Sequence, residues 1–245
     1  MPPPLLPLIL PLEIRYRIFQ LLSDKTLALE YPEVFRAIAP DFLRELRVGR
    51  SYPSDIERFQ NQFVEIYPSC GVYAHLLTLV ADPSSVNLIT NFLQSFPFPN
   101  NLKHLRIEES KLPGTFWSAE SLPYLNLLEE LLASSPTLTR LSFYNFRPCS
   151  SLISSPPSLT RLDFGLRVPL NPDFHIHLPS QLEIISLTPV LVGYLSRPPP
   201  PALRVLVVYA DEKNSSTLIS EVQSYIAQLP SLTKIVLVDR SKCFI

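Results

Sequence analysis

One phrase recurs along this chain: leucine, any two residues, an aliphatic residue, any residue, and a further apolar residue. Clear copies are LKHLRI, LTRLSF, LTRLDF and LRVLVV, and eight copies begin at residues 43, 74, 102, 138, 159, 182, 203 and 232, the second opening with alanine. Within each copy apolar and polar residues alternate, which is the periodicity of a strand with one buried face. Successive copies begin 31, 28, 36, 21, 23, 21 and 29 residues apart, so each strand is followed by a return of variable length.

A single strand of this kind cannot bury its apolar face, but a stack of such strands can. Inward residues such as Leu105 and Ile107 are expected to pack on Leu141 and Phe143 of the next copy. Spacings of about 20–29 residues are typical of leucine-rich repeats, and the longer early spacings indicate insertions. The sequence therefore predicts an α/β fold over residues 43–245: an irregular leucine-rich-repeat solenoid with a parallel sheet and helical or extended returns. An ordinary α/β domain, in which strands also alternate with helices, is the alternative.

The returns between strands differ in composition. Residues 55–66, 86–96, 122–132 and 216–229 carry apolar residues at helical spacing and are predicted to be helices. The chain has 27 prolines and 5 glycines, and proline removes a backbone donor and breaks helix interiors. The returns around Pro156–Pro157 and Pro198–Pro201 are therefore predicted to be extended or single-turn crossovers.

Composition narrows the functional class. The net charge is -1 and the charges are scattered, which argues against a nucleic-acid partner. The cysteines are Cys70, Cys149 and Cys243, widely spaced, which favours a reducing compartment over disulfides or structural zinc. No segment is apolar over the roughly 18 residues of a membrane helix, and the proline-interrupted start lacks the basic region and cleavage site of a secretory signal. We expect a soluble cytoplasmic or nuclear protein with no membrane partner.

The N-terminal sequence LPLEIRYRIFQLL, residues 10–22, has the pattern of an amphipathic helix. Pro11 suits the first turn, where its missing N–H costs nothing, and Glu13 lies near the positive end of the helix. Ile14, Ile18, Leu21 and Leu22 fall on one face. A second apolar segment follows and leads directly into the first copy of the repeated phrase.

This region resembles the F-box, a short helical module, and residues 1–42 are interpreted as such a module. The resemblance is carried by the opening Leu-Pro, the acidic residue two positions later, and the apolar helix: Leu10, Pro11, Glu13, Ile14, Ile18, Phe19 and Leu22. The layout also resembles fungal-type F-box proteins with irregular leucine-rich repeats. The second half departs from the family, because Phe35 stands where a tryptophan is usual and Tyr31-Pro32 stand where Val-Cys is usual.

The resemblance implies a substrate-recognition adaptor of an SCF-type ubiquitin ligase. The seven N-terminal residues would dock on a Skp-type adaptor, and through it on cullin and RING subunits, while the repeats hold a target protein. The chain would then be non-catalytic and act by bringing the target close to the conjugating enzyme. The alternative is a repeat scaffold without a ubiquitin role, in which the N-terminal helix is a cap packed against Phe42, Leu46 and the first repeat. The two differ in whether Leu10, Pro11, Ile18 and Leu22 are open to a partner or buried against the first repeat.

The target-binding surface is predicted from the period of two along each strand. Residues that point away from the core include His104, Arg106, Arg140, Tyr144, Arg161 and Asp163, a mildly basic and aromatic set of the kind enriched at interfaces. On the last two strands the outward residues are apolar: Val205, Val207, Tyr209, Val236 and Val238. They are interpreted as covered by the C-terminal tail, with a binding patch as the alternative.

Motifs of catalysis are not found in the sequence. It contains no GxSxG, GxxxxGK[ST] or GxGxxG, and its carboxylates have no spacing that suggests acid–base chemistry. His175 and His177 form an HxH that zinc could use, but only Asp173 accompanies them. We therefore expect no enzyme activity, no metal site and no cofactor.

Overall fold

The fold is taken from a computed structural model of the 245-residue chain. It describes residues 11, 14, 17–18, 21, 31, 34, 39–40, 42–49, 60–61, 63–65, 68–96, 101–109, 122–165, 175–195, 197–210 and 216–239. Among these residues, no helix has the length and apolar character needed to cross a membrane.

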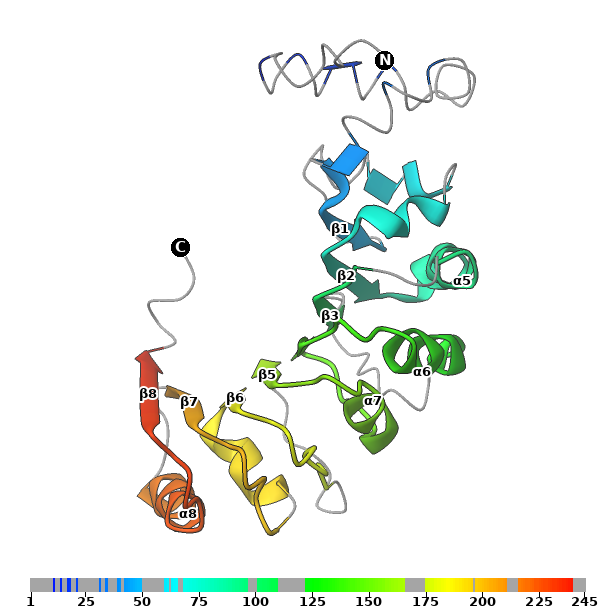
Figure 1. Cartoon of the computed structure of the whole chain (residues 1–245). Coiled ribbons are helices and arrows are strands. Elements are labelled where there is room, and N and C mark those ends of the chain that lie inside the picture. Colours follow the sequence, from blue (N-terminus) through cyan, green and yellow to red (C-terminus); the bar gives the residue numbers. More distant parts are fainter. Residues whose placement is uncertain are drawn as a thin grey trace.

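Eight strands form one parallel sheet in which each strand lies beside the next one in the sequence. They are β1 (Glu45–Val48), β2 (Leu76–Ala81), β3 (His104–Glu109), β4 (Arg140–Tyr144), β5 (Arg161–Gly165), β6 (Ile184–Leu187), β7 (Val205–Ala210) and β8 (Lys234–Asp239). Every strand begins at the third residue of one copy of the repeated phrase. The sheet curves into an arc, with the strands along the inner side and the helices along the outer side (Figure 1). The predicted leucine-rich-repeat-like solenoid is confirmed over these strands.

The register of the strands aligns one apolar row on the core side. Leu46, Leu77, Leu105, Leu141, Leu162, Ile185 and Leu206 are aligned and fully buried. The second core row contains aromatic residues, and Phe143 stacks on Phe146 and Phe164 with ring centroids 5.9 Å apart in each case. From β1 to β7 each repeat thus buries its apolar face against its neighbours, as the alternating pattern predicted.

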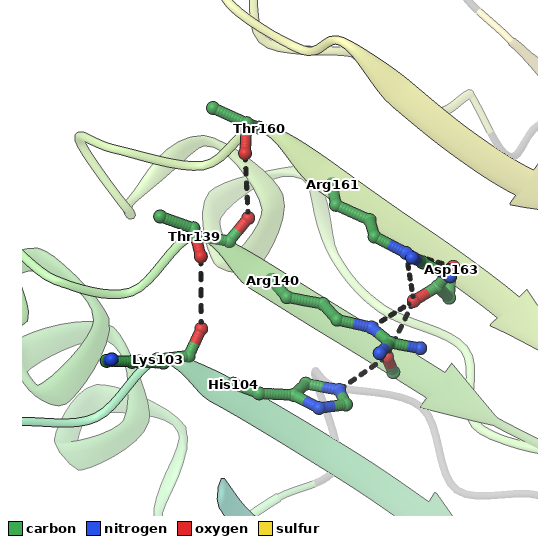
Figure 2. A network of polar contacts seen from close by, with 8 residues as sticks. Lys103, His104, Thr139, Arg140, Thr160, Arg161 and Asp163 are labelled. Carbon is green, nitrogen blue, oxygen red and sulfur yellow. Dashed lines mark hydrogen bonds and ion pairs between the residues drawn. The ribbon is translucent and has the colours of Figure 1, made fainter. Parts of the chain in front are cut away.

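A backbone motif repeats at every junction between strands. The carbonyl oxygen of the residue before each strand accepts two N–H groups from the next repeat; Lys103 O, for instance, accepts from Thr139 N and Arg140 N at 3.1 Å. Equivalent carbonyls belong to Arg44, His75, Thr139, Thr160, Glu183 and Arg204. Threonine side chains reinforce three junctions by donating their hydroxyls to these carbonyls. Figure 2 shows the bonds of Thr139 and Thr160, and Thr233 makes the same bond to Arg204 O. This ladder satisfies the backbone at the start of each strand and runs unbroken along the sheet.

The returns follow their predicted types. The longer helices on the outer side are α5 (Val86–Gln94), α6 (Leu125–Ala133) and α8 (Ser216–Ile226), close to the predicted bounds. α7 (Ser150–Ser154) is a single-turn helix that ends before Pro156. Short 3-10 helices also lie in the described returns: η2 (Pro68–Tyr73), η3 (Pro83–Ser85) and η5 (Pro189–Tyr194). Within the predicted helix at 55–66, residues 60–61 and 63–65 are helical and the others lie outside the described residues.

The outer edge of β1 is closed by two side-chain amides. Gln60 donates from Nε2 to Glu45 O (2.9 Å) and Phe42 O (3.2 Å), and its Oε1 accepts from Arg47 N (3.2 Å). Asn61 bonds both the N–H and the carbonyl of Gly49, at 2.9 and 3.0 Å. These amides replace the backbone partners that a preceding strand would supply. Gly49 has a φ of +113°, and a Cβ there would lie 2.6 Å from Val80 O, so this position requires glycine.

The other end of the sheet is different. Ile235 and Leu237 of β8 align with the buried Leu206 and Val208 of β7, yet they are 46% and 72% exposed. Within the part of the chain that the structure describes, no group hydrogen-bonds the outer edge of β8. The core-side row therefore ends in an apolar, exposed strand.

Candidate functional site

The inner, concave face carries the side chains that point away from the core. The aligned strands place them in rows, since residues paired across a parallel sheet share a face. One row contains His104, Arg140, Arg161, Ile184 and Val205, and the next contains Arg47, Thr78, Arg106, Ser142, Asp163, Ser186, Val207 and Val236. Glu108, Tyr144 and Gly165 align in a further row, as do Tyr209 and Val238. The structure thus brings all six residues predicted for target binding onto one surface spanning β3–β5.

Asp163 is the centre of a polar network on this surface (Figure 2). Its carboxylate accepts from Arg140 Nε at 2.6 Å, from Arg161 Nε at 3.1 Å and from Ser142 Oγ at 3.2 Å. Its side chain is only 2% exposed, whereas those of Arg140 and Arg161 are 35% and 37% exposed. Asp163 therefore lies beneath the two arginines and holds them in place, and the arginines are the exposed part of the network.

The charge state of Asp163 follows from these contacts. Burial by itself raises the pKa of a carboxyl group, because it removes water from the charged form. The nearby Ser186 hydroxyl, the hydrogen bond from Arg140 and the charges of Arg140 and Arg161 outweigh this effect and hold the pKa of Asp163 below its usual value. Asp163 is thus ionised at neutral pH and neutralises part of the charge above it.

His104 extends the network to β3. Its Nε2 lies 2.8 Å from Ser142 Oγ, and because the Ser142 hydroxyl donates to Asp163, we assign the proton between them to His104 Nε2. Burial, followed by the charge of Arg140, lowers the pKa of His104 from 6.5 to about 4. The imidazole is therefore neutral at pH 7, and the cationic character of this surface comes from the arginines.

A second cluster of charged side chains links β1, β3 and β4. Glu108 forms an ion pair with Arg106 and accepts from Arg47 Nη2 at 2.7 Å. The guanidinium of Arg106 lies 4.1 Å from the centre of the Tyr144 ring, which is a cation–π distance. A Cβ on Gly165 would lie 2.5 Å from Tyr144 Cδ1, so the glycine leaves room for this ring. The pairing of Arg47 with Glu108 was not predicted, because no local pattern connects residues 61 positions apart.

Beyond β5 the concave face becomes apolar. Ile184, Val205, Val207, Val236 and Val238 are partly exposed there. Tyr209 lies in this half, and burial, followed by the nearby Tyr144 and Asp163, raises its pKa. The sequence left two interpretations of these apolar residues: cover by the C-terminal tail, or a binding patch. The tail, residues 240–245, lies outside the described residues, so the first interpretation stays a prediction.

The predicted adaptor-binding residues are described in part. Pro11 is exposed and accepts the N–H of Ile14, and Ile14 is 47% exposed. Leu21, on the same predicted helix face, is 65% exposed, whereas Ile18 is partly buried and packs against the core of the array. Leu10, Glu13, Phe19 and Leu22 lie outside the described residues.

The remaining reactive side chains do not gather into a site. His175 and His177 are both exposed, and the described residues contain no group of three or more potential metal ligands. Burial raises the pKa of the Cys70 thiol to about 12, so it is protonated at neutral pH. A depression of about 620 Å³ beside α5 is lined by residues such as Val64, Asn87 and Asn91 and includes one ionisable side chain, Glu65.

The described strands, their register and the carbonyl ladder define an α/β solenoid of the leucine-rich-repeat type. Neither a protein-family model nor a curated protein matches the chain. Among solved structures, it is similar to the leucine-rich repeat-containing protein LegL7 from Legionella pneumophila, at 15% identity and a TM-score of 0.34. The similarity covers 80% of this chain and 84% of that one.

Proposed function

We propose that this chain is the substrate-recognition subunit of an SCF-type ubiquitin ligase. An F-box at the N-terminus docks on a Skp-type adaptor, and through it on cullin and RING subunits, while the concave face of the solenoid binds a target protein. The chain contributes no catalytic group and raises the effective concentration of the target near the conjugating enzyme.

The observation that carries the proposal is the exposure of Pro11 and Ile14, two of the predicted adaptor-binding residues. A helix whose task is to cap the array would bury these residues, whereas an adaptor-binding helix presents them. Ile18 is partly buried against the hydrophobic core, which is what the alternative of a capping helix expects, so the adaptor test below is needed to separate the two. Exposed aliphatic side chains on one helix face are typical of a helix that docks in the groove of a partner.

The concave face supports the target-binding half of the proposal. It presents Arg106, Arg140, Arg161 and Tyr144 on rigid strands, and arginine and tyrosine are enriched at interface hot spots. Their orientation is fixed before binding by Asp163, Glu108 and the Arg106–Tyr144 stack. A pre-organised surface loses less conformational entropy when it binds, which favours affinity.

The test is a pull-down of the purified full chain with a purified Skp-type adaptor. The variant Ile14→Lys, on the exposed helix face, is expected to abolish binding without unfolding the chain, as checked by circular dichroism. Val72→Lys, at another exposed apolar position in η2, is the matched control and is expected to bind like the parent. Absence of binding by the parent would contradict the ligase proposal and leave a repeat scaffold without a ubiquitin role.

A further inference from the structure

The concave face has two chemically different halves that lie side by side. On β3–β5, the three arginines Arg106, Arg140 and Arg161 face the two carboxylates of Glu108 and Asp163, and Arg47 of β1 shares Glu108. On β6–β8 the partly exposed side chains are aliphatic apart from Tyr209, and the edge residue Lys234 is exposed. A partner that fits the whole face therefore needs both an anionic part and an apolar part.

The basic half is built to receive an anion. Arg140 and Arg161 both bond Asp163 through Nε, and among the described contacts their terminal nitrogens have no hydrogen-bond partner. Two such groups on neighbouring strands, each about one-third exposed, form a pair of forks suited to a carboxylate. One buried carboxylate neutralises only one of the two guanidiniums, so a net positive charge remains at this position.

The apolar half is equally ordered. Val207 and Val236 are directly paired across β7 and β8, as are Tyr209 and Val238, so their side chains lie in adjacent rows on one surface. These residues are on the face opposite the core, and they are not among the side chains that pack against it. They offer an apolar floor whose contact with a ligand would remove water from it.

The distance between the two halves follows from the geometry of the sheet. Arg140 and Arg161 start one row away from Val207 and Val236, but both guanidiniums bond Asp163, which lies in the valine row. The guanidiniums therefore lie between β4 and β5 in that row, and the valine pair lies between β7 and β8, three strand spacings away. Neighbouring strands are about 4.8 Å apart, which gives about 14 Å. An extended peptide advances about 3.3 Å per residue, so roughly four residues span the two halves.

We propose that the concave face binds an extended peptide segment that crosses the strands, with an acidic residue over Arg140 and Arg161 and an aliphatic residue about four positions away over Val207 and Val236. Charge complementarity and the apolar floor favour this occupant over a nucleic acid, which would leave the valines unused. The inference deepens the target-binding half of the proposed function and is independent of the adaptor.

The experiment is a selection of random twelve-residue displayed peptides on the immobilised full chain, followed by fluorescence anisotropy of synthetic peptides from the selected consensus. The central variant is Arg140→Gln/Arg161→Gln/Asp163→Asn. It removes the charges of both arginines and of Asp163 in one protein, so that no buried carboxylate is left without its partners. Arg204→Gln removes the same net charge at an exposed residue outside the rows, and it is the matched control. A second variant, Val207→Thr/Val236→Thr, keeps the shape and the strand preference of valine while adding hydroxyls.

The expected consensus contains an acidic and an aliphatic residue about four positions apart. The central variant should weaken binding of such a peptide at least about tenfold, and should no longer select acidic residues, whereas Arg204→Gln binds like the parent. The valine variant should lose the aliphatic preference and keep the acidic one. No enriched peptide, a consensus without an acidic residue, or equal weakening by Arg204→Gln would overturn the inference.

The peptide selection and the adaptor pull-down test different proposals, so a negative result in one does not decide the other. Adaptor binding without a peptide consensus would remove the acidic–aliphatic inference and leave the ligase proposal intact. A peptide consensus without adaptor binding would remove the ligase proposal and leave a peptide-binding face.

Discussion

At the N-terminal end of the sheet the amides of Gln60 and Asn61 bond the outer edge of β1, whereas at the C-terminal end Ile235 and Leu237 of β8 are exposed. Both strands carry the same repeated phrase, and both have a neighbour on one side only. Their environments differ because a return segment folds over β1, while the described residues after β7 include no equivalent for β8. A solenoid strand therefore takes its stability from what covers it as much as from its own sequence.

The largest expected difference in stability is between two leucine-to-alanine variants on the core-side face of the sheet, one in β1 and one in β8. Leu46→Ala removes a fully buried side chain and should lower the free energy of unfolding by roughly 2–5 kcal/mol. Leu237→Ala truncates a side chain that is mostly exposed to water, and it should change the free energy of unfolding by no more than about 0.5 kcal/mol. Urea unfolding followed by circular dichroism measures both. Equal losses would mean that the C-terminal end is as well covered as the N-terminal one.

Removing the edge amide should have the next largest effect. Gln60→Leu keeps the size of the side chain but leaves Glu45 O and Arg47 N without these partners, at a cost of roughly 1–3 kcal/mol. Gln228→Leu, at an exposed position after α8, is the matched control and should be nearly neutral. Hydrogen exchange of β1 amides in the Gln60 variant should also accelerate. Unchanged exchange would show that the amide does not protect this edge.

Lowering the pH should destabilise the middle strands, β3–β5, before it destabilises the strands at either end of the sheet. His104 has its pKa lowered from 6.5 to about 4, so below pH 6.5 the unfolded chain takes up a proton that the folded chain resists. The stability that His104 contributes is therefore present above pH 6.5 and is lost as the pH falls towards 4. The lowered pKa of Asp163 acts in the same direction at still lower pH.

The melting temperature should consequently fall between pH 7 and pH 4.5, and this fall should be smaller in His104→Gln than in the parent. His175→Gln, which alters an exposed histidine outside the network, is the control and should follow the parent curve. Protection of β3–β5 amides should decrease before that of β1. A His104 variant with the parent's pH dependence would contradict the assignment of the lowered pKa.

The smallest effect on stability is expected from Leu237→Lys. A lysine on an exposed edge strand costs little, within about 0.5 kcal/mol, and opposes pairing with other strands. Light scattering over a range of protein concentrations should show less self-association in this variant than in the parent. A large loss of stability instead would indicate that another segment packs on β8.

The sequence was sufficient to predict the strands, because eight copies of one alternating phrase leave little freedom in where a strand begins. It also predicted the face of the sheet on which each side chain lies, since Arg106, Arg140 and Arg161 follow from a period of two. Helix bounds were less accurate: α6 begins at Leu125, three residues after the predicted start at Leu122. Helix termini depend on tertiary contacts that a periodicity does not contain.

The organisation of the concave face could not be predicted from the pattern alone. Asp163 was expected to be an outward residue open to a target, and it is in the predicted row but buried beneath Arg140 and Arg161. The Gln60 and Asn61 edge contacts were also missed, since an amide that replaces a strand has no periodic signature. Both features depend on residues brought together by the register of different repeats, which becomes visible only in three dimensions.

The paired N–H groups on each junction carbonyl have a consequence for how such a chain can change during evolution. The distance in sequence between successive strands varies from 21 to 36 residues, yet the same two bonds join every pair of repeats. Insertions and deletions in the returns are therefore absorbed on the outer side, without shifting a single inner side chain. Duplication of one repeat would lengthen the arc by one strand and add the outward side chains of that strand to its inner surface.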